Sequence, residues 1–466
     1  MQSKHIIPSL RQIFPAFIVI CICLTTISTY AQSFKLMRYD ENYSILKDSS
    51  KNFYDHIKFI PLSGDKKIYL SFGGEARFEY AAFNNEDWGK MNTGHNNFLL
   101  QRYDLHADLH IGSNVRIFSQ LRSALEGGRK NGPRPIDEDQ LNVQNLFVDV
   151  VAWKHQDKSL TFRAGRQEID YGSGRLISVR EGPNARLYFT GGKVMYASSN
   201  LSVDGFVMMA DTTYTGVFDN KSTRQANLWG VYSKLIIPRS GNMDFYYLGI
   251  HREASTFEEG TANEVRHTIG TRLWKYGGGF IYNLEAAWQF GKFGNGNISA
   301  WTGSIDIGYS FETVKFKPTI NLRNDYISGD KRAGDGNLQT FNPLYPKGGY
   351  FGFDPQVGPV NLIDIHPYGT LALLKNLTLQ MDVVFNWRYS LQDGIYRPSG
   401  TFNMAGAASG KRYIGTAYLA SAVYSLSKFI SMNTGIQYFN TGSFAHDVIP
   451  DPKNGLFINS RIAFKF

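Results

Sequence analysis

Cysteine is almost absent from this chain of 466 residues, and the two that it has, Cys21 and Cys23, lie within its first 31 residues. The chain after residue 31 can therefore form neither disulfides nor thiolate metal sites. We expect hydrogen bonds and packing to stabilise it.

Long apolar runs are also missing after residue 31, where no stretch approaches the ~18 apolar residues of a membrane-spanning helix. The mean hydropathy of −0.28 is that of a water-soluble protein. Yet the chain is rich in Phe (33), Tyr (27), Trp (7) and Gly (46). A transmembrane β-barrel combines these properties, because only alternate residues of its strands face lipid.

Motifs of common catalytic sites are absent, since the sequence has no GxSxG, HExxH or P-loop. The carboxylate pair Glu75 and Glu79 has no spacing that distinguishes it from ordinary surface acids. His106 and His110 would lie ~13 Å apart on a strand, too far to bind one metal ion together. We expect no catalytic site, no metal site and no cofactor.

The first 31 residues have the pattern of a secretory signal peptide. Two basic residues precede an apolar run over 14–24, and Thr29 and Ala31 supply the small residues before a cleavage site at Gln32. A transmembrane anchor is the alternative, but the run is shorter than the ~20 residues that a spanning helix needs.

Charge is modestly positive, with 49 Lys and Arg against 40 Asp and Glu and a formal net charge of +9. This excess suits an anionic ligand, or contact with an anionic membrane surface. We expect no nucleic-acid partner.

Apolar and polar residues alternate along most of the chain with a period of two. In residues 67–83 the charged residues Glu75, Arg77 and Glu79 alternate with Ala76, Phe78 and Tyr80. In a soluble sandwich the apolar face would be the core, whereas in a barrel it faces lipid and the charged face lines the lumen.

Strand length favours the barrel, because several alternating stretches, such as 184–197, exceed the 5–6 residues of ordinary globular strands. We count roughly 17 to 19 strands and predict 18, since bacterial single-chain barrels close with even numbers. The expected organisation is therefore an all-β, single transmembrane antiparallel barrel over 67–466, preceded by a periplasmic segment over 32–66.

The C-terminus carries a further signal. Leu456, Ile458, Ile462, Phe464 and Phe466 share one face of the last strand. A terminal Phe after such alternation resembles the signal by which the barrel assembly machinery recognises its substrates. We expect a monomer in the lipid of the bacterial outer membrane.

Longer polar segments interrupt the strands near 84–96, 127–139, 213–223, 327–359 and 391–410. We expect extracellular loops or lumen inserts there. For 328–359 the Gly and Pro content allows a gate or a plain surface loop.

Arginine is concentrated between residues 163 and 186. Acids and glycines separate these arginines; the charged residues of the cluster are Arg163, Arg166, Glu168, Asp170, Arg175, Arg180 and Arg186. Arginine binds carboxylates bidentately and keeps its charge, so the cluster could attract a polyanion in a confined lumen. The alternative is that Arg–acid ladders only make the barrel wall rigid.

The same region resembles the alginate export family of outer-membrane barrels. The matching motifs are Gly165-Arg166-Gln167-Glu168, Tyr171-Gly172-Ser173-Gly174-Arg175-Leu176 and Asn184-Ala185-Arg186, then Ser328-Gly329-Asp330, Thr340-Phe341-Asn342-Pro343-Leu344-Tyr345-Pro346, Tyr350-Phe351-Gly352, and Asn361-Leu362 to His366-Pro367.

The resemblance implies an 18-stranded barrel with an electropositive constriction that passes an anionic polysaccharide. By motif position Arg166, Arg175 and Arg186 become lumen residues, and strand parity alone adds Arg102, Arg323 and Arg388. The predicted function is a channel for an anionic, alginate-like polysaccharide or a related acidic solute. A general porin for small solutes and a polysaccharide-acting enzyme are the alternatives, because fold does not fix function.

Overall fold

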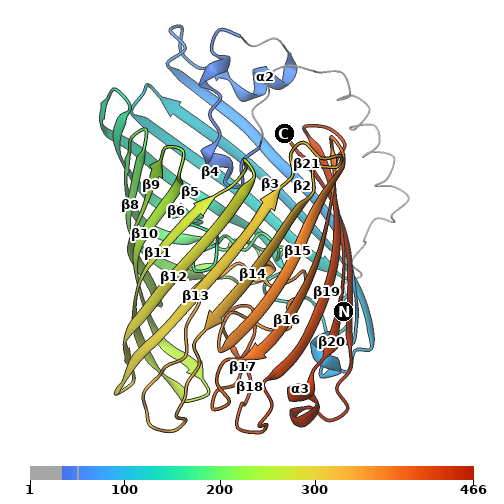
Figure 1. Ribbon diagram of the computed structural model, residues 1–466. Helices are drawn as coiled ribbons and strands as arrows, with labels where there is room; N and C mark the ends of the chain where they lie inside the picture. Colours follow the sequence, from blue (N-terminus) through green and yellow to red (C-terminus); the bar gives the residue numbers. More distant parts are fainter. Residues whose placement is uncertain (1–33, 50–51) are drawn as a thin grey trace, which may run out of the picture.

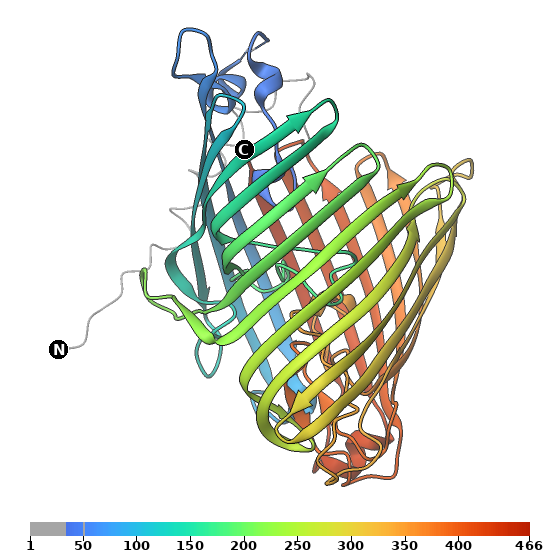
Figure 2. The same ribbon diagram turned by 90° about the vertical axis from the view of Figure 1, so that its left-hand side faces the viewer.

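The computed structural model describes residues 34–49 and 52–466. In these residues an antiparallel sheet closes into one barrel of 18 strands, as predicted (Figures 1 and 2). Each barrel strand pairs with its neighbour in the chain, and β21 pairs with β2 to close the wall. The predicted signal peptide lies outside the described residues.

The barrel strands are β2 (Ile68–Asn84), β3 (His95–Ile111), β4 (Val115–Gly127), β5 (Asp139–His155), β6 (Lys158–Gln167), β7 (Phe189–Ala197), β8 (Leu201–Thr212), β9 (Lys221–Ile237), β10 (Gly241–Phe257), β11 (Gly260–Lys275), β12 (Phe280–Phe293), β13 (Gly296–Ser310), β14 (Thr319–Ile327), β15 (Leu362–Leu374), β16 (Leu377–Arg388), β19 (Tyr413–Ser425), β20 (Ile430–Thr441) and β21 (Gly455–Lys465).

The smaller elements are η1 (Arg38–Asp40), η2 (Ser44–Leu46), α2 (Phe53–Lys58), β1 (Ile60–Pro61), η3 (Glu86–Gly89), η4 (Gly348–Tyr350), β17 (Ile395–Tyr396), β18 (Phe402–Met404) and α3 (Ser443–Val448). None of the helices in the described part of the chain is long and apolar enough to cross a membrane.

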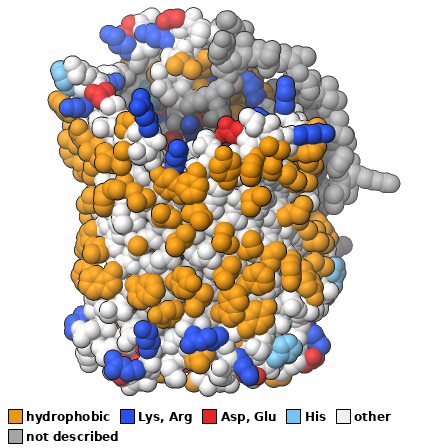
Figure 3. Space-filling view, in the orientation of Figure 1, with side chains coloured by type: hydrophobic (Ala, Val, Ile, Leu, Met, Phe, Trp, Pro, Cys, Tyr) orange, Lys and Arg blue, Asp and Glu red, His pale blue; other side chains and the backbone are white. Residues whose placement is uncertain are grey.

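The two faces of the strands differ as the alternation predicts. Ile269, Trp288 and Trp301 lie side by side on β11, β12 and β13 and are 45%, 47% and 40% exposed. Thr268 precedes Ile269 and Gln289 follows Trp288, and both side chains are fully buried inside the barrel. Figure 3 shows the result as a broad apolar belt, with charged side chains gathered at both ends. The apolar face therefore meets lipid, and closure pairs the backbone groups that lipid cannot satisfy.

The two ends of the barrel have different connections. Most turns at one end are short, as at 112–114 and 156–157, and α2 and the C-terminus lie at this end (Figure 1). Long connections at the other end include those that hold β17, β18 and α3. Outer-membrane barrels have short periplasmic turns and longer extracellular loops, so we expect the end with α2 to face the periplasm and call the other end extracellular.

The strand predicted over 184–197 is wrong in its first part, because β7 begins only at Phe189. The side-chain amide of Asn184 donates hydrogen bonds to the carbonyl oxygens of Gln101, Leu125 and Asp137, at 2.9, 3.2 and 3.1 Å. These bonds hold residues 184–188 in the connection that precedes the strand.

Candidate functional site

Two long connections from the extracellular end fold into the lumen. The first insert, residues 168–188, joins β6 to β7, and the second insert, residues 328–361, joins β14 to β15. They pair with each other along their backbones: Ser178 N donates to Tyr345 O at 2.9 Å, and Lys347 N donates to Gly174 O at 2.8 Å. The two sequence blocks that carry the family resemblance therefore meet in space.

Apolar packing fixes both inserts to the wall. Ile177 of the first insert and Phe341 and Leu344 of the second are at most 2% exposed, and they join a cluster with Leu248 of β10. Such a cluster gives the inserts one packed position, because protein interiors pack closely and without voids.

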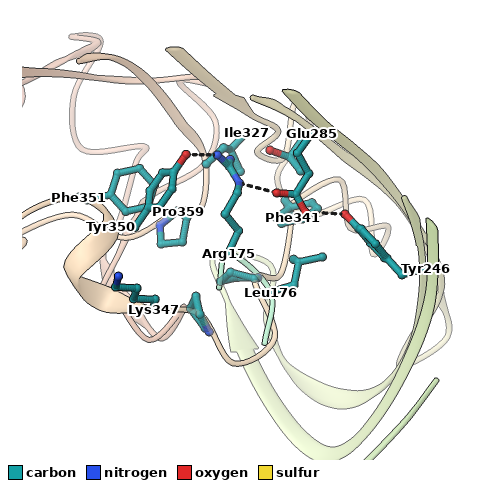
Figure 4. Close-up of a pocket in the computed structure, with 13 residues that line it drawn as sticks. Arg175, Leu176, Tyr246, Glu285, Ile327, Phe341, Lys347, Tyr350, Phe351 and Pro359 are labelled. Carbon is teal, nitrogen blue, oxygen red and sulfur yellow. Dashed lines mark hydrogen bonds and ion pairs between the residues drawn. The ribbon is translucent and has the colours of Figure 1, made fainter. Parts of the chain in front are cut away.

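Arg175 lies at the centre of this contact (Figure 4). Its guanidinium forms an ion pair with Asp325 of β14, and it donates to the hydroxyl of Tyr350 at 2.6 Å. Glu285 of β12 lies 3.8 Å from Arg175 Nε and accepts a bond from Tyr246. The cavity beside them is only about 10 Å³, room for roughly one water molecule. Arg175 thus holds the inserts against the wall.

Arg102 and Arg186 both interact with acidic residues of the first insert. Arg102 of β3 is fully buried, with Glu75 at 3.0 Å and Glu181 of the insert as its partners. Arg186 bonds Glu168 at 3.0 Å and lies 3.3 Å from Glu181. Both arginines are therefore compensated by carboxylates.

Arg163 and Arg166 of β6 form ion pairs with carboxylates on other strands. Arg163 meets Asp149 of β5 at 2.6 Å and is 5% exposed, and Arg166 meets Asp211 of β8 at 3.1 Å with its side chain 19% exposed. Asp170, in the first insert, accepts a hydrogen bond from Val179 N at 3.2 Å.

Arg323 and Arg388, which were predicted from strand parity, have different surroundings. Arg323 of β14 bonds Asp306 at 2.9 Å and stacks on Tyr350, with 4.2 Å to the ring centroid. Arg388 is fully buried and donates only to backbone carbonyls, those of Leu391, Asp393, Gly406, Ser409 and Lys411. Arg388 thus stabilises the conformation of the loop after β16.

Arg180 differs from the rest of the predicted cluster. Its Nε donates to Pro346 O at 3.3 Å, and the charged group that acts on it most strongly is Arg252 of β10. Arg252 in turn donates to Leu344 O at 2.8 Å. Among the described residues, no carboxylate lies within ion-pair distance of Arg180, Arg252 or the neighbouring Lys347. We call these three residues, which form no ion pair of their own, the uncompensated cations; the carboxylates of Glu264 and Asp170 act on Arg252 and Lys347 from a greater distance.

Sequence reasoning missed Arg252 and Lys347. Strand parity could have found Arg252, because it lies an even number of residues from the inward-facing Tyr246 and Leu248 on β10. Nothing in the sequence signals Lys347, whose place depends on the pairing of the two inserts. Arg77 and Arg122, which alternation places on the charged strand faces, and Arg266 and Arg272 are also buried but were not among the candidate site residues.

Comparison with known proteins agrees with this architecture. The family model described as alginate export matches residues 68–458. No curated protein matches the sequence.

Solved outer-membrane channels share the fold at low identity. OccAB1 of Acinetobacter baumannii superposes with a TM-score of 0.58 at 12% identity, over 89% of this chain and 100% of that one. A BenF-like porin from Pseudomonas fluorescens gives 0.57 at 10%, over 85% and 98%. OccK2 (OpdF) of Pseudomonas aeruginosa, solved in complex with glucuronate, gives 0.54 at 9%, over 89% and 99%.

Proposed function

The chain belongs to the alginate export family, and on that premise we propose that this outer-membrane channel passes acidic solutes, including anionic alginate-like polysaccharide. The channel has no enzymatic role in this proposal. Its neighbour in fold, OccK2, was solved with the acidic sugar glucuronate, which supports carboxylated sugars as the solute class.

The uncompensated cations are the observation that carries the proposal. Most buried arginines of the wall form an ion pair with a carboxylate, as Arg163 does with Asp149. Arg180 and Arg252 donate to backbone carbonyls at residues 344–346, Arg252 also lies over the Tyr345 ring, 5.1 Å from its centroid, and the side chain of Lys347 is exposed beside them. Three positive charges therefore surround one short segment of the second insert. A low-dielectric wall strengthens the attraction of such charges for an anion.

The general-porin alternative predicts no preference between charged and neutral solutes of one size. In liposomes that contain the purified protein, we expect glucuronate to enter faster than glucose. Replacing Arg252→Gln together with Lys347→Gln should reduce the ratio of the two rates several-fold. Lys315→Gln, in the periplasmic turn between β13 and β14, is the matched control and should leave it unchanged. Equal rates for both sugars in the unmodified channel would contradict the proposal.

A further inference from the structure

The segment before α2 enters the periplasmic mouth of the barrel. Arg38 donates to the carbonyl oxygens of Gly74, at 3.0 Å, and Phe466, at 2.7 Å, where β2 meets β21. Glu41 completes this contact with an ion pair to Arg38 at 2.8 Å. Arg38 and Glu41 are 6% and 5% exposed, so the segment is fixed to the closing seam of the barrel.

Tyr39 connects the segment to the barrel wall and to the first insert. Its ring packs against Phe118 of β4 and Phe147 of β5, with centroids 5.8 and 5.2 Å apart. Its hydroxyl donates to the carbonyl oxygen of Glu168, the first residue of the first insert, at 2.6 Å. Arg186 also donates from that insert to Leu36 O, at 3.2 Å. The segment therefore touches the first insert directly.

Asp40 adds an electrostatic contact with the lumen wall. Its side chain is exposed in the lumen, and the wall cations that act on its carboxylate most strongly are Arg163 of β6, Lys193 of β7 and Arg116 of β4. Each of these cations also pairs with a wall carboxylate, Asp149, Asp204 and Asp108 respectively, so Asp40 joins a network of paired charges on the periplasmic half of the wall.

Residues 44–49 and 52–58 anchor the segment at the mouth. Tyr54 of α2 packs on Phe429 of the β19–β20 turn, with ring centroids 5.0 Å apart. The ammonium of Lys58 is buried over the ring of Tyr43, at 4.8 Å. The anchor is periplasmic, so the part that enters the lumen can leave it without detaching from the barrel.

We propose that residues 34–43 are an inner plug that narrows the periplasmic half of the pore and opens by withdrawing towards α2. The plug is held by the polar contacts of Leu36, Arg38 and Tyr39 and by the buried rings of Tyr39 and Tyr43, whereas the second insert places Phe341, Leu344 and Phe351 in the main apolar cluster. Segments with few buried apolar contacts open at the lowest free-energy cost. This device regulates how wide the pore is, and it operates whatever the charge preference of the constriction.

Single-channel conductance of the full chain in planar bilayers tests the plug. Because the narrowest part of a pore limits its current, the Arg38→Ala/Tyr39→Ala variant should conduct about twofold more than the unmodified channel, or switch often to such a level. Ile45→Ala, an exposed position of the neighbouring anchor (64% exposed), is the matched control and should not change the conductance. An unchanged conductance in the correctly folded double variant would overturn the proposal.

Thiol labelling gives a second measurement that does not depend on loosening the seam. Residues 34–466 contain no cysteine, so a single Asp40→Cys substitution provides one reactive group. A bulky thiol reagent on that group should reduce the current, whereas the same reagent on Lys47→Cys, outside the mouth, should not. A current that is the same before and after complete labelling of Asp40→Cys would show that the segment lies outside the conduction path and overturn the plug. Neither measurement depends on ion selectivity, so the plug and the proposed solute class are tested separately.

Discussion

Most charged side chains inside the barrel serve its structure. Arg175 and Asp325 are the clearest example, because both are nearly inaccessible and come from an insert and the wall. A buried ion pair adds little net stability, yet removing one partner is costly since the other charge stays buried without compensation. This contrast separates structural arginines from the uncompensated cations.

Replacing Arg175→Gln should therefore destabilise the barrel by about 3 kcal/mol or more, because Asp325 would keep a buried charge. Urea unfolding in lipid vesicles, followed by tryptophan fluorescence, measures this change. The control is Arg180→Gln, which leaves no carboxylate behind and should change the free energy of unfolding little. Adding Asp325→Asn to Arg175→Gln should restore part of the loss, and equal losses in both arginine variants would contradict this account.

Asp354 of the second insert should make the local packing depend on pH. Burial raises the pKa of this carboxyl to about 7, Arg134 and Arg129 oppose the increase, and Glu86 and Asp87 add to it. Because the folded pKa lies above the unfolded value, the packed insert favours the protonated form, and this stabilisation is lost as the pH rises through about 7.

Hydrogen exchange at Phe353 and Asp354 checks this expectation, since both amides donate to Gln437 Oε1, at 2.8 and 3.2 Å. After correction for the intrinsic pH dependence of amide exchange, these two amides should be less protected at a pH above the pKa of Asp354 than at a pH below it. Asp354→Asn should remove the pH dependence, and protection that stays constant in the unmodified protein would rule out the effect.

At the scale of single elements, the strands were predictable and the inserts were not. Alternation in β2 and β3 places Glu75 and Arg102 on the buried face because a strand has a local period of two. The pairing of Ser178 with Tyr345 depends on two segments 167 residues apart in sequence, and no local pattern encodes it. Hence the sequence predicted the arginine cluster, but it left open whether 328–359 enters the lumen and could not separate paired arginines from Arg180.

The glycines of β6 and β7 let neighbouring strands approach closely beneath the inserts. Gly165 and Gly191 lie opposite each other, and a Cβ at Gly191 would overlap Val207 O and lie 2.8 Å from Met208 Cα. Backbone atoms cannot move aside without disturbing the ladder, so Gly191→Ala should reduce the folded fraction. The adjacent Gly192→Ala should be tolerated, because its Cβ would meet Arg163 O at 3.8 Å. Heat-modifiable migration in gels measures the folded fraction, and equal folding of both variants would refute this explanation.

At the scale of the whole molecule, β21 closes the barrel and ends at Lys465, one residue before Phe466. Closure rests on backbone pairing from Glu75–Lys465 to Asn84–Leu456, which the Phe466 ring does not make. We therefore expect Phe466→Ala to refold in detergent as the unmodified chain does, while less of it reaches the outer membrane in cells. Isolated outer membranes, compared by quantitative immunoblot, give the readout. Normal amounts in the membrane would argue against a role of the terminal Phe in recognition by the assembly machinery.

The account as a whole depends on the charge beside the two inserts, where we propose that the three uncompensated cations meet the solute. The most direct measurement is the reversal potential of the purified channel in a planar bilayer under a salt gradient. We predict selectivity for anions, lost when Arg180→Gln, Arg252→Gln and Lys347→Gln are combined. Cation selectivity in the unmodified channel, or anion selectivity that survives all three substitutions, would contradict it.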